Sequence, residues 1–98
     1  MGNTPGHAHI NLEEDPFKGE DNVIVNSGEI GFLSSCFDQG AEFDLVIEDS
    51  LGREKFRESI KSETTRWGKR IDLTAGDSHL KVRVEIAKNA KNVDVFVD

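Results

Sequence analysis

The chain of 98 residues is acidic, with a net charge of -7, a hydrophobic fraction of 36% and a single cysteine. Its apolar content excludes a disordered chain, and the single cysteine excludes an internal disulfide. Residues 1–50 hold eleven acids and one base, whereas residues 51–98 hold eight acids and eleven bases. Because phosphate contacts need a concentrated cationic face, the acidic half argues against nucleic-acid binding.

No membrane span or targeting segment is recognised in the sequence, so we expect a soluble chain and leave its compartment open. The N-terminal segment, residues 1–20, is expected to be loosely ordered because Pro5, Gly6, Pro16 and Gly19 interrupt it. Within it, Ala8, Ile10 and Leu12 alternate with polar residues, which predicts a first strand. We therefore expect this segment to precede a sandwich over residues 21–98, in one domain overall.

Two short strands are predicted next, at residues 21–26 and 29–37. The second is expected to turn Ile30, Phe32 and Cys36 to one apolar face. Cys36 would then be a buried small hydrophobe and not an activated thiolate.

Residues 42–49 read as the clearest half-buried strand, and the following turn, in which Gly52 can take a positive φ, predicts a hairpin. Its register follows from two apolar pairs, Ile47 with Phe56 and Phe43 with Ile60. On the reverse face this register brings two opposite-charge pairs together, Glu48 with Lys55 and Glu42 with Lys61. The alternative is a helix over Arg53 to Thr65, with Phe56 and Ile60 at helical spacing.

Three further strands complete the pattern, each with one apolar face. Their predicted inward residues are Trp67, Ile71 and Leu73, then Leu80, Val82, Val84 and Ile86, and finally Val93, Val95 and Val97. Seven or eight strands in 98 residues predict an all-β fold, an antiparallel two-sheet β-sandwich of the immunoglobulin-like or jelly-roll kind.

Residues 73–84, LTAGDSHLKVRV, resemble the late hairpin of jelly-roll carbohydrate-binding modules and the corresponding turn of immunoglobulin-like bacterial domains. The stretch Asn92-Val93-Asp94 is similar to the last strand of such modules, and the resemblance covers about a quarter of the chain. It implies a β-sandwich that presents aromatic rings to sugars. The chain has no Tyr, so Trp67 and whichever Phe stays exposed are the candidates for that role.

Two other surfaces are candidate sites. His7 and His9 point the same way on a strand, so they could chelate one transition metal, although a pair of solvent-facing histidines explains the same pattern. The acidic residues near the N-terminus could contact a basic protein partner, or simply be a solvated face. They are Glu13, Glu14, Asp15, Glu20 and Asp21.

No nucleophile elbow, phosphate-cradling loop or dinucleotide fingerprint occurs, so we predict neither an enzyme nor a bound cofactor. The sequence favours a non-catalytic β-sandwich module that binds a protein partner, with no membrane contact. The alternatives are a carbohydrate-binding module and a small acidic inhibitor or metal-binding protein. The oligomeric state stays open.

Overall fold

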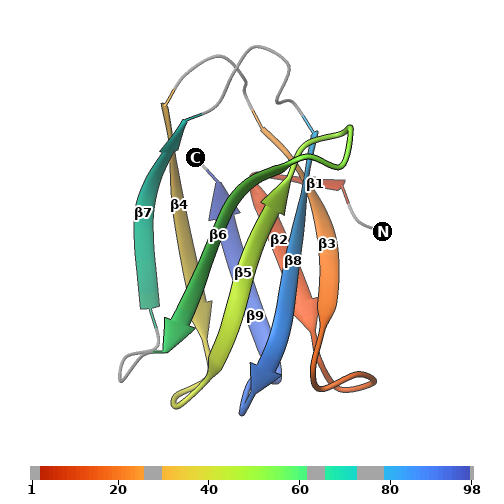
Figure 1. The fold of residues 1–98 in the computed structure, drawn as a ribbon, viewed down its shortest axis with the longest axis vertical. Helices are drawn as coiled ribbons and strands as arrows, with labels where there is room; N and C mark the ends of the chain where they lie inside the picture. The colour runs from red at the N-terminus through yellow and green to blue at the C-terminus, as the bar shows by residue number, and fades with distance from the viewer. Residues whose placement is uncertain (1–2, 26–29, 62–65, 73–78, 98) are drawn as a thin grey trace.

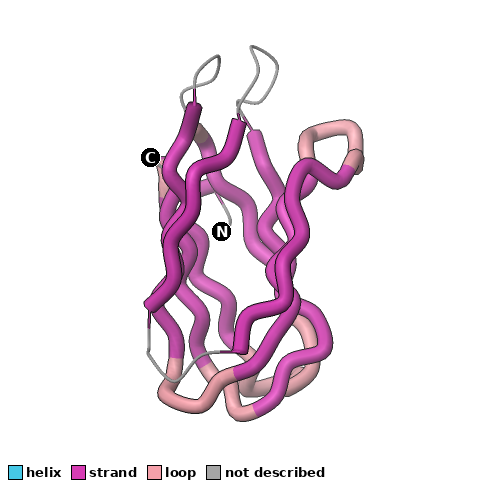
Figure 2. Tube along the Cα trace, turned by 60° about the vertical axis from the view of Figure 1, so that its left-hand side comes forward, coloured by secondary structure: helices cyan, strands magenta, loops and turns pink. Residues whose placement is uncertain are grey.

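The computed structural model describes residues 3–25, 30–61, 66–72 and 79–97. These residues form strands and connecting loops, arranged as two sheets that face each other (Figures 1 and 2). The strands are β1 (Asn3–Pro5), β2 (His7–Asn11), β3 (Gly19–Ile24), β4 (Ile30–Phe37), β5 (Glu42–Glu48), β6 (Glu54–Lys61), β7 (Arg66–Asp72), β8 (His79–Lys88) and β9 (Asn92–Val97). One sheet has the order β1-β3-β8-β5-β6, and the other has the order β2-β9-β4-β7.

The strand order identifies a jelly roll. From β2 onward, successive strands alternate between the two sheets except for the β5–β6 hairpin, which stays within one sheet. An immunoglobulin fold instead keeps its first two strands in the same sheet. The predicted antiparallel sandwich is therefore confirmed in its jelly-roll form. All eight predicted strands are present, and the three-residue β1, parallel to β3, adds to them.

The inward faces of the strands meet in one hydrophobic core. Ala8 and Ile10 of β2, with Leu12 just beyond it, are buried as their alternation predicts, although they belong to the segment expected to be loosely ordered. Both sheets contribute fully buried side chains to the centre of the core. Among them are Leu33, Leu45, Ile47, Leu80, Val82, Val84, Val93 and Val95. The division of the chain at residue 20 stays a prediction.

The β5–β6 hairpin is confirmed, with Ile47 opposite Phe56 and Phe43 opposite Ile60. The alternative helix is wrong over Glu54–Lys61, which is strand β6. One detail of the register differs, because an irregularity after Ile47 sets Glu48 opposite Glu54 and not opposite Lys55. The register fixed by the two apolar pairs therefore holds along most of the hairpin and shifts only next to the turn.

The inward face of β4 was predicted wrongly at Cys36, which is exposed. Leu33, Ser35 and Phe37 are the buried residues of this strand. Both faces of the strand carry apolar residues, so alternation alone could not choose between them. Leu33 and Phe37 fill the core, and the buried Ser35 hydroxyl is satisfied because it donates to the Asp94 carbonyl at 3.0 Å.

The inward face of β8 was predicted wrongly at Ile86, which is 69% exposed. A bulge interrupts the β5–β8 register: Glu42 pairs with Lys88 and Asp44 pairs with Glu85, so Ile86 and Ala87 together oppose one residue of β5. The extra residue reverses the alternation, and Ala87 takes the buried place.

The two sheets approach each other closely where β2 lies near β3. A Cβ on Gly19 would lie 2.7 Å from Cγ2 of Ile10 and 3.2 Å from Cδ2 of Leu12. A side chain at this position would therefore collide with the core, which explains why the sequence has a glycine there.

Part of the predicted pattern lies outside the described residues. This holds for the side chains of Ile30, Phe32, Trp67 and Ile71, for Leu73, and for the turn over residues 73–78. Within the described part of the chain, no helix is long and apolar enough to cross a membrane.

Candidate functional site

Three connections meet at one end of the sandwich: β2–β3, β4–β5 and β8–β9, at the lower end of Figure 1. A groove of about 990 Å³ lies among them. Its apolar walls are Leu12, Pro16, Phe17, Ala87 and Ala90, and its polar walls are Glu13, Asp38, Lys88, Asn89 and Lys91. This mixture of apolar surface with a few polar groups is typical of a binding site for a small organic ligand.

Among the phenylalanines whose side chains the structure describes, Phe17 is the most exposed, at 66%, and it lies beside this groove. Its backbone is held at both polar atoms. The N–H of Phe17 donates to the Asp15 carboxylate at 3.0 Å, and its carbonyl accepts the N–H of Ala87 at 2.9 Å. The ring is therefore attached to a fixed point on the scaffold, which lowers the entropy lost when a ligand packs against it.

Asp38 fixes another wall of the groove. One of its carboxylate oxygens accepts the backbone N–H of Lys91 at 2.7 Å and that of Asn92 at 3.0 Å. The hydrogen bond from Asn92, followed by that from Lys91, holds the pKa of Asp38 below its ordinary value, against the opposing effect of burial. The β8–β9 turn, in which Asn89 has a φ of 57°, is thereby tied to the end of β4.

The groove offers both hydrogen-bond donors and acceptors around its apolar surface. Lys88, Asn89 and Lys91 supply donors, while Glu13 and the carbonyl of Asn89 supply acceptors. A ligand with several hydroxyl groups and an apolar face matches these features, because each hydroxyl can both donate and accept.

Comparison with known proteins supports the fold of the chain. No family model matches the chain, and no curated protein matches its sequence. Solved structures do match. The pre-peptidase C-terminal domain of a Bacillus anthracis collagenase aligns with a TM-score of 0.62 at 10% identity, over 98% of this chain and 90% of that domain.

Two similar structures have names that denote sugar binding. A CBM4 carbohydrate-binding module aligns with a TM-score of 0.52 at 12% identity, over 97% of this chain and 70% of that one. The lectin domain of lectinolysin, solved with Lewis B antigen, aligns with a TM-score of 0.54 at 14% identity, over 94% of this chain and 70% of that one. The chain thus has the β-sandwich fold that these modules share, as its sequence resemblance implied.

The five predicted acidic contacts do not form one free surface. Glu13, Glu14 and Glu20 are exposed, and Glu20 lies 3.4 Å from Lys81. Asp15 and Asp21 are half-buried and accept backbone N–H groups, from Phe17 and from His9 and Asn22 respectively. Two of the five therefore shape the loop and the neighbouring strands.

His7 and His9 do lie on the same outer face of the four-stranded sheet. Nε2 of His7 and Nδ1 of His9 approach the same oxygen of Asp94, at 2.9 and 2.8 Å. Hydrogen bonds from His9 and His7 keep the pKa of Asp94 below its ordinary value, even though burial, the largest single influence, raises it. Among the described residues, no three histidine, cysteine or acidic side chains are arranged to hold a metal ion. Metal binding by His7 and His9 stays a prediction.

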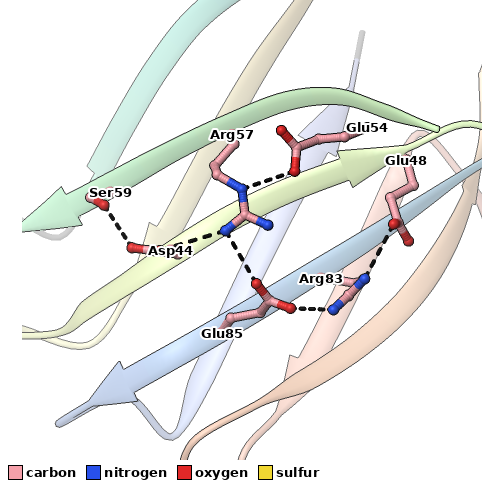
Figure 3. Close-up of polar contacts among 7 residues, drawn as sticks. All are labelled: Asp44, Glu48, Glu54, Arg57, Ser59, Arg83 and Glu85. Carbon is pink, nitrogen blue, oxygen red and sulfur yellow. Dashed lines mark hydrogen bonds and ion pairs between the residues drawn. The ribbon is translucent and has the colours of Figure 1, made fainter. Parts of the chain in front are cut away.

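The outer face of the other sheet carries a network of ion pairs (Figure 3). Arg57 of edge strand β6 donates to Glu54 at 2.9 Å and to Glu85 at 3.2 Å. Arg83 of β8 donates to Glu48 at 3.2 Å and also contacts Glu85. The basic residues of the hairpin are therefore interleaved with acids, which opposes phosphate binding there.

Phe17 was not singled out from the sequence. The signal for it is a negative one: Phe17 lies between Pro16 and Lys18 in a loop, outside every alternating run. A large aromatic residue with no place in the apolar pattern of a strand is a candidate for exposure. Its neighbour in the groove, the β8–β9 turn, is 72 to 74 residues further along the chain, and only the fold brings the two together.

Proposed function

We propose that this chain is a non-catalytic carbohydrate-binding module, with Phe17 as the surface on which a sugar ring packs. The observation that carries the proposal is the exposed ring of Phe17, held by two backbone hydrogen bonds beside a groove with donors and acceptors. A sugar has an apolar C–H face and a rim of hydroxyl groups, so the ring and the polar walls complement its two parts.

The fold supports this proposal, because jelly rolls include lectin domains. The similar structures named CBM4 and lectin domain support it in the same way, through the fold. Trp67, the other aromatic candidate, remains a prediction as a sugar-binding residue.

The test is affinity electrophoresis of the chain through gels that contain different plant and bacterial polysaccharides, followed by calorimetry with the polysaccharide that retards it most. We expect Phe17→Ala to weaken binding about tenfold or more, as removal of a central aromatic contact does. Phe96→Ala is the matched control, since Phe96 is an exposed aromatic residue on the outer face of the four-stranded sheet, away from the groove. Equal retardation of wild type and Phe17→Ala, or retardation by none of the polysaccharides, would contradict the proposal.

A protein partner is the second candidate, and one observation favours it. Glu13 and Glu14 are adjacent, exposed acids that make no side-chain ion pair within the described part of the chain. We propose that a basic partner would contact these two residues first. Capture of the same protein from host lysate at low salt, lost at high salt and with Glu13→Gln plus Glu14→Gln, would support it. Capture unaffected by salt and by both substitutions would exclude this surface.

A further inference from the structure

Ile86 has an unusual backbone conformation for its residue type. Its φ is 53°, in the left-handed region that β-branched residues rarely adopt. Glycine or asparagine would occupy this position in the bulge with less strain. The bulge therefore accounts for the conformation of this residue, but it does not account for an isoleucine side chain.

The isoleucine side chain also gains little from packing within the chain, because it is 69% exposed. A strained residue with an exposed apolar side chain suggests that the side chain contacts something outside the chain, since such strain gathers at ligand sites. The next residue, Ala87, donates its N–H to the carbonyl of Phe17, so the bulge adjoins the proposed sugar-binding ring.

A second, smaller hollow lies beside Ile86, with a volume of about 160 Å³. Its other walls are Glu42, Phe43, Asp44, Ser59, Ile60, Lys61 and Lys88. The carboxylates and the cationic groups around it provide acceptors and donors for hydroxyl groups. Ser59 donates to Asp44 at 2.7 Å, which holds that carboxylate in place.

Lys88 is a wall of both hollows. The groove beside Phe17 and the hollow beside Ile86 are therefore neighbours across one flexible, exposed side chain. The groove lies at the lower end of the sandwich in Figure 1, and the residues around the hollow beside Ile86 belong to the lower parts of β5, β6 and β8.

We infer that the ligand is a chain of sugar units, which binds with one unit on Phe17 and a later unit against Ile86. This inference rests on the proposed function and specifies it, since a binding site for a single terminal sugar would not use Ile86. Lys88 lies between the two subsites and donates to hydroxyl groups of the connecting units. Affinity therefore rises with chain length until both subsites are filled.

The experiment is calorimetry of the full chain with cello-, xylo- and manno-oligosaccharides of two and of six units. For the series that binds, we expect the six-unit oligosaccharide to bind more tightly than the two-unit one. Ile86→Ala should lower the affinity for the six-unit sugar about tenfold, because the contact that buries the isoleucine against the sugar is lost. The affinity for the two-unit sugar should stay unchanged in Ile86→Ala. Leu51→Ala, which shortens a similarly exposed apolar side chain in the β5–β6 turn, should change neither affinity.

The outcomes separate the two proposals. If Phe17→Ala weakens binding while Ile86→Ala binds the six-unit sugar as wild type does, the second subsite is excluded and the proposed function stands. If wild type binds no member of the three series, this inference fails whether or not a polysaccharide retards the chain. Ile86→Gly is the second variant, and it must show the same loss although its backbone strain is relieved.

Discussion

The strain at Ile86 predicts that replacing this residue with glycine raises the stability of the domain, although the same substitution should weaken binding of the longer sugar. A non-glycine residue in the left-handed region costs roughly 1–2 kcal/mol, whereas glycine in a strand costs about 0.5–1 kcal/mol of backbone entropy. Because Ile86 is mostly exposed, its removal creates no cavity in the core. At the midpoints of these two ranges, the net effect of Ile86→Gly is then a gain of about 0.75 kcal/mol in the free energy of unfolding.

Urea unfolding followed by circular dichroism measures this free energy, and thermal melts measure it independently. For a domain of this size, a gain of that order raises the melting temperature by about 2–8 °C. The slope of the urea transition should stay the same, since the surface exposed on unfolding hardly changes.

Ile86→Ala is the control that isolates the backbone. Alanine keeps the Cβ that makes a positive φ unfavourable, yet it removes the exposed apolar groups beyond it. We therefore expect Ile86→Ala to gain much less stability than Ile86→Gly. Equal gains in the two variants, or a loss in Ile86→Gly, would refute the reasoning, because either result means that backbone strain is not what the glycine relieves.

Three further predictions concern the fold. Gly19→Ala should destabilise the domain by about 1–3 kcal/mol in urea unfolding, because its Cβ would meet Ile10 at 2.7 Å; an unchanged midpoint would contradict this. Leu45→Ala should cost about 2–5 kcal/mol, and Arg83→Gln on the outer face of the same sheet under about 1 kcal/mol; a reversed order would mean that the ion pairs of this face stabilise the domain more than its core does. Because backbone hydrogen bonds lower the pKa of Asp38 in the folded state, its carboxylate stabilises the domain fully above the unfolded-state pKa of about 3.9. This stabilisation is lost as the pH falls from there through the lower, folded-state pKa. The drop in urea midpoint from pH 5 to pH 3 should thus be smaller in Asp38→Asn than in wild type, and an equal drop would exclude Asp38 as a source.

The fold could be predicted from the sequence wherever one face of a strand is apolar and the other polar. His7 to Leu12 and the β5–β6 hairpin meet this condition; the buried residues of the first were predicted correctly, and so was the register of the hairpin up to the irregularity after Ile47. Prediction failed where both faces carry apolar residues, as around Cys36, and where a bulge inserts a residue, as at Ile86. A bulge is set by packing against a neighbouring strand, so a rule based on strict alternation cannot anticipate it.

The candidate site was harder to predict because no single segment carries it. Phe17 belongs to a loop between two sheets, and Asp38 and Lys88 come from distant parts of the chain. The sequence resemblance directed attention to residues 73–84, which carry it, and to Trp67 or an exposed Phe as the aromatic ring that such a module would need. The groove lies at other residues, because the jelly-roll strand order determines which loops meet at each end of the sandwich.

The bulge in β8 connects the strain at one residue with the placement of another. Inserting Ile86 turns Ala87 inward and leaves the Ala87 N–H bonded to the carbonyl of Phe17. A regular strand would shift every later residue of β8 by one place, and this hydrogen bond would be lost. The bulge thus fixes the loop that carries the exposed ring, while its left-handed position can be filled by any residue that tolerates a positive φ. Substitution of Ile86 by glycine or alanine keeps the extra residue, and with it the bulge that holds Phe17 in place. It removes only the isoleucine side chain, so these two variants test the external contact separately from the placement of Phe17.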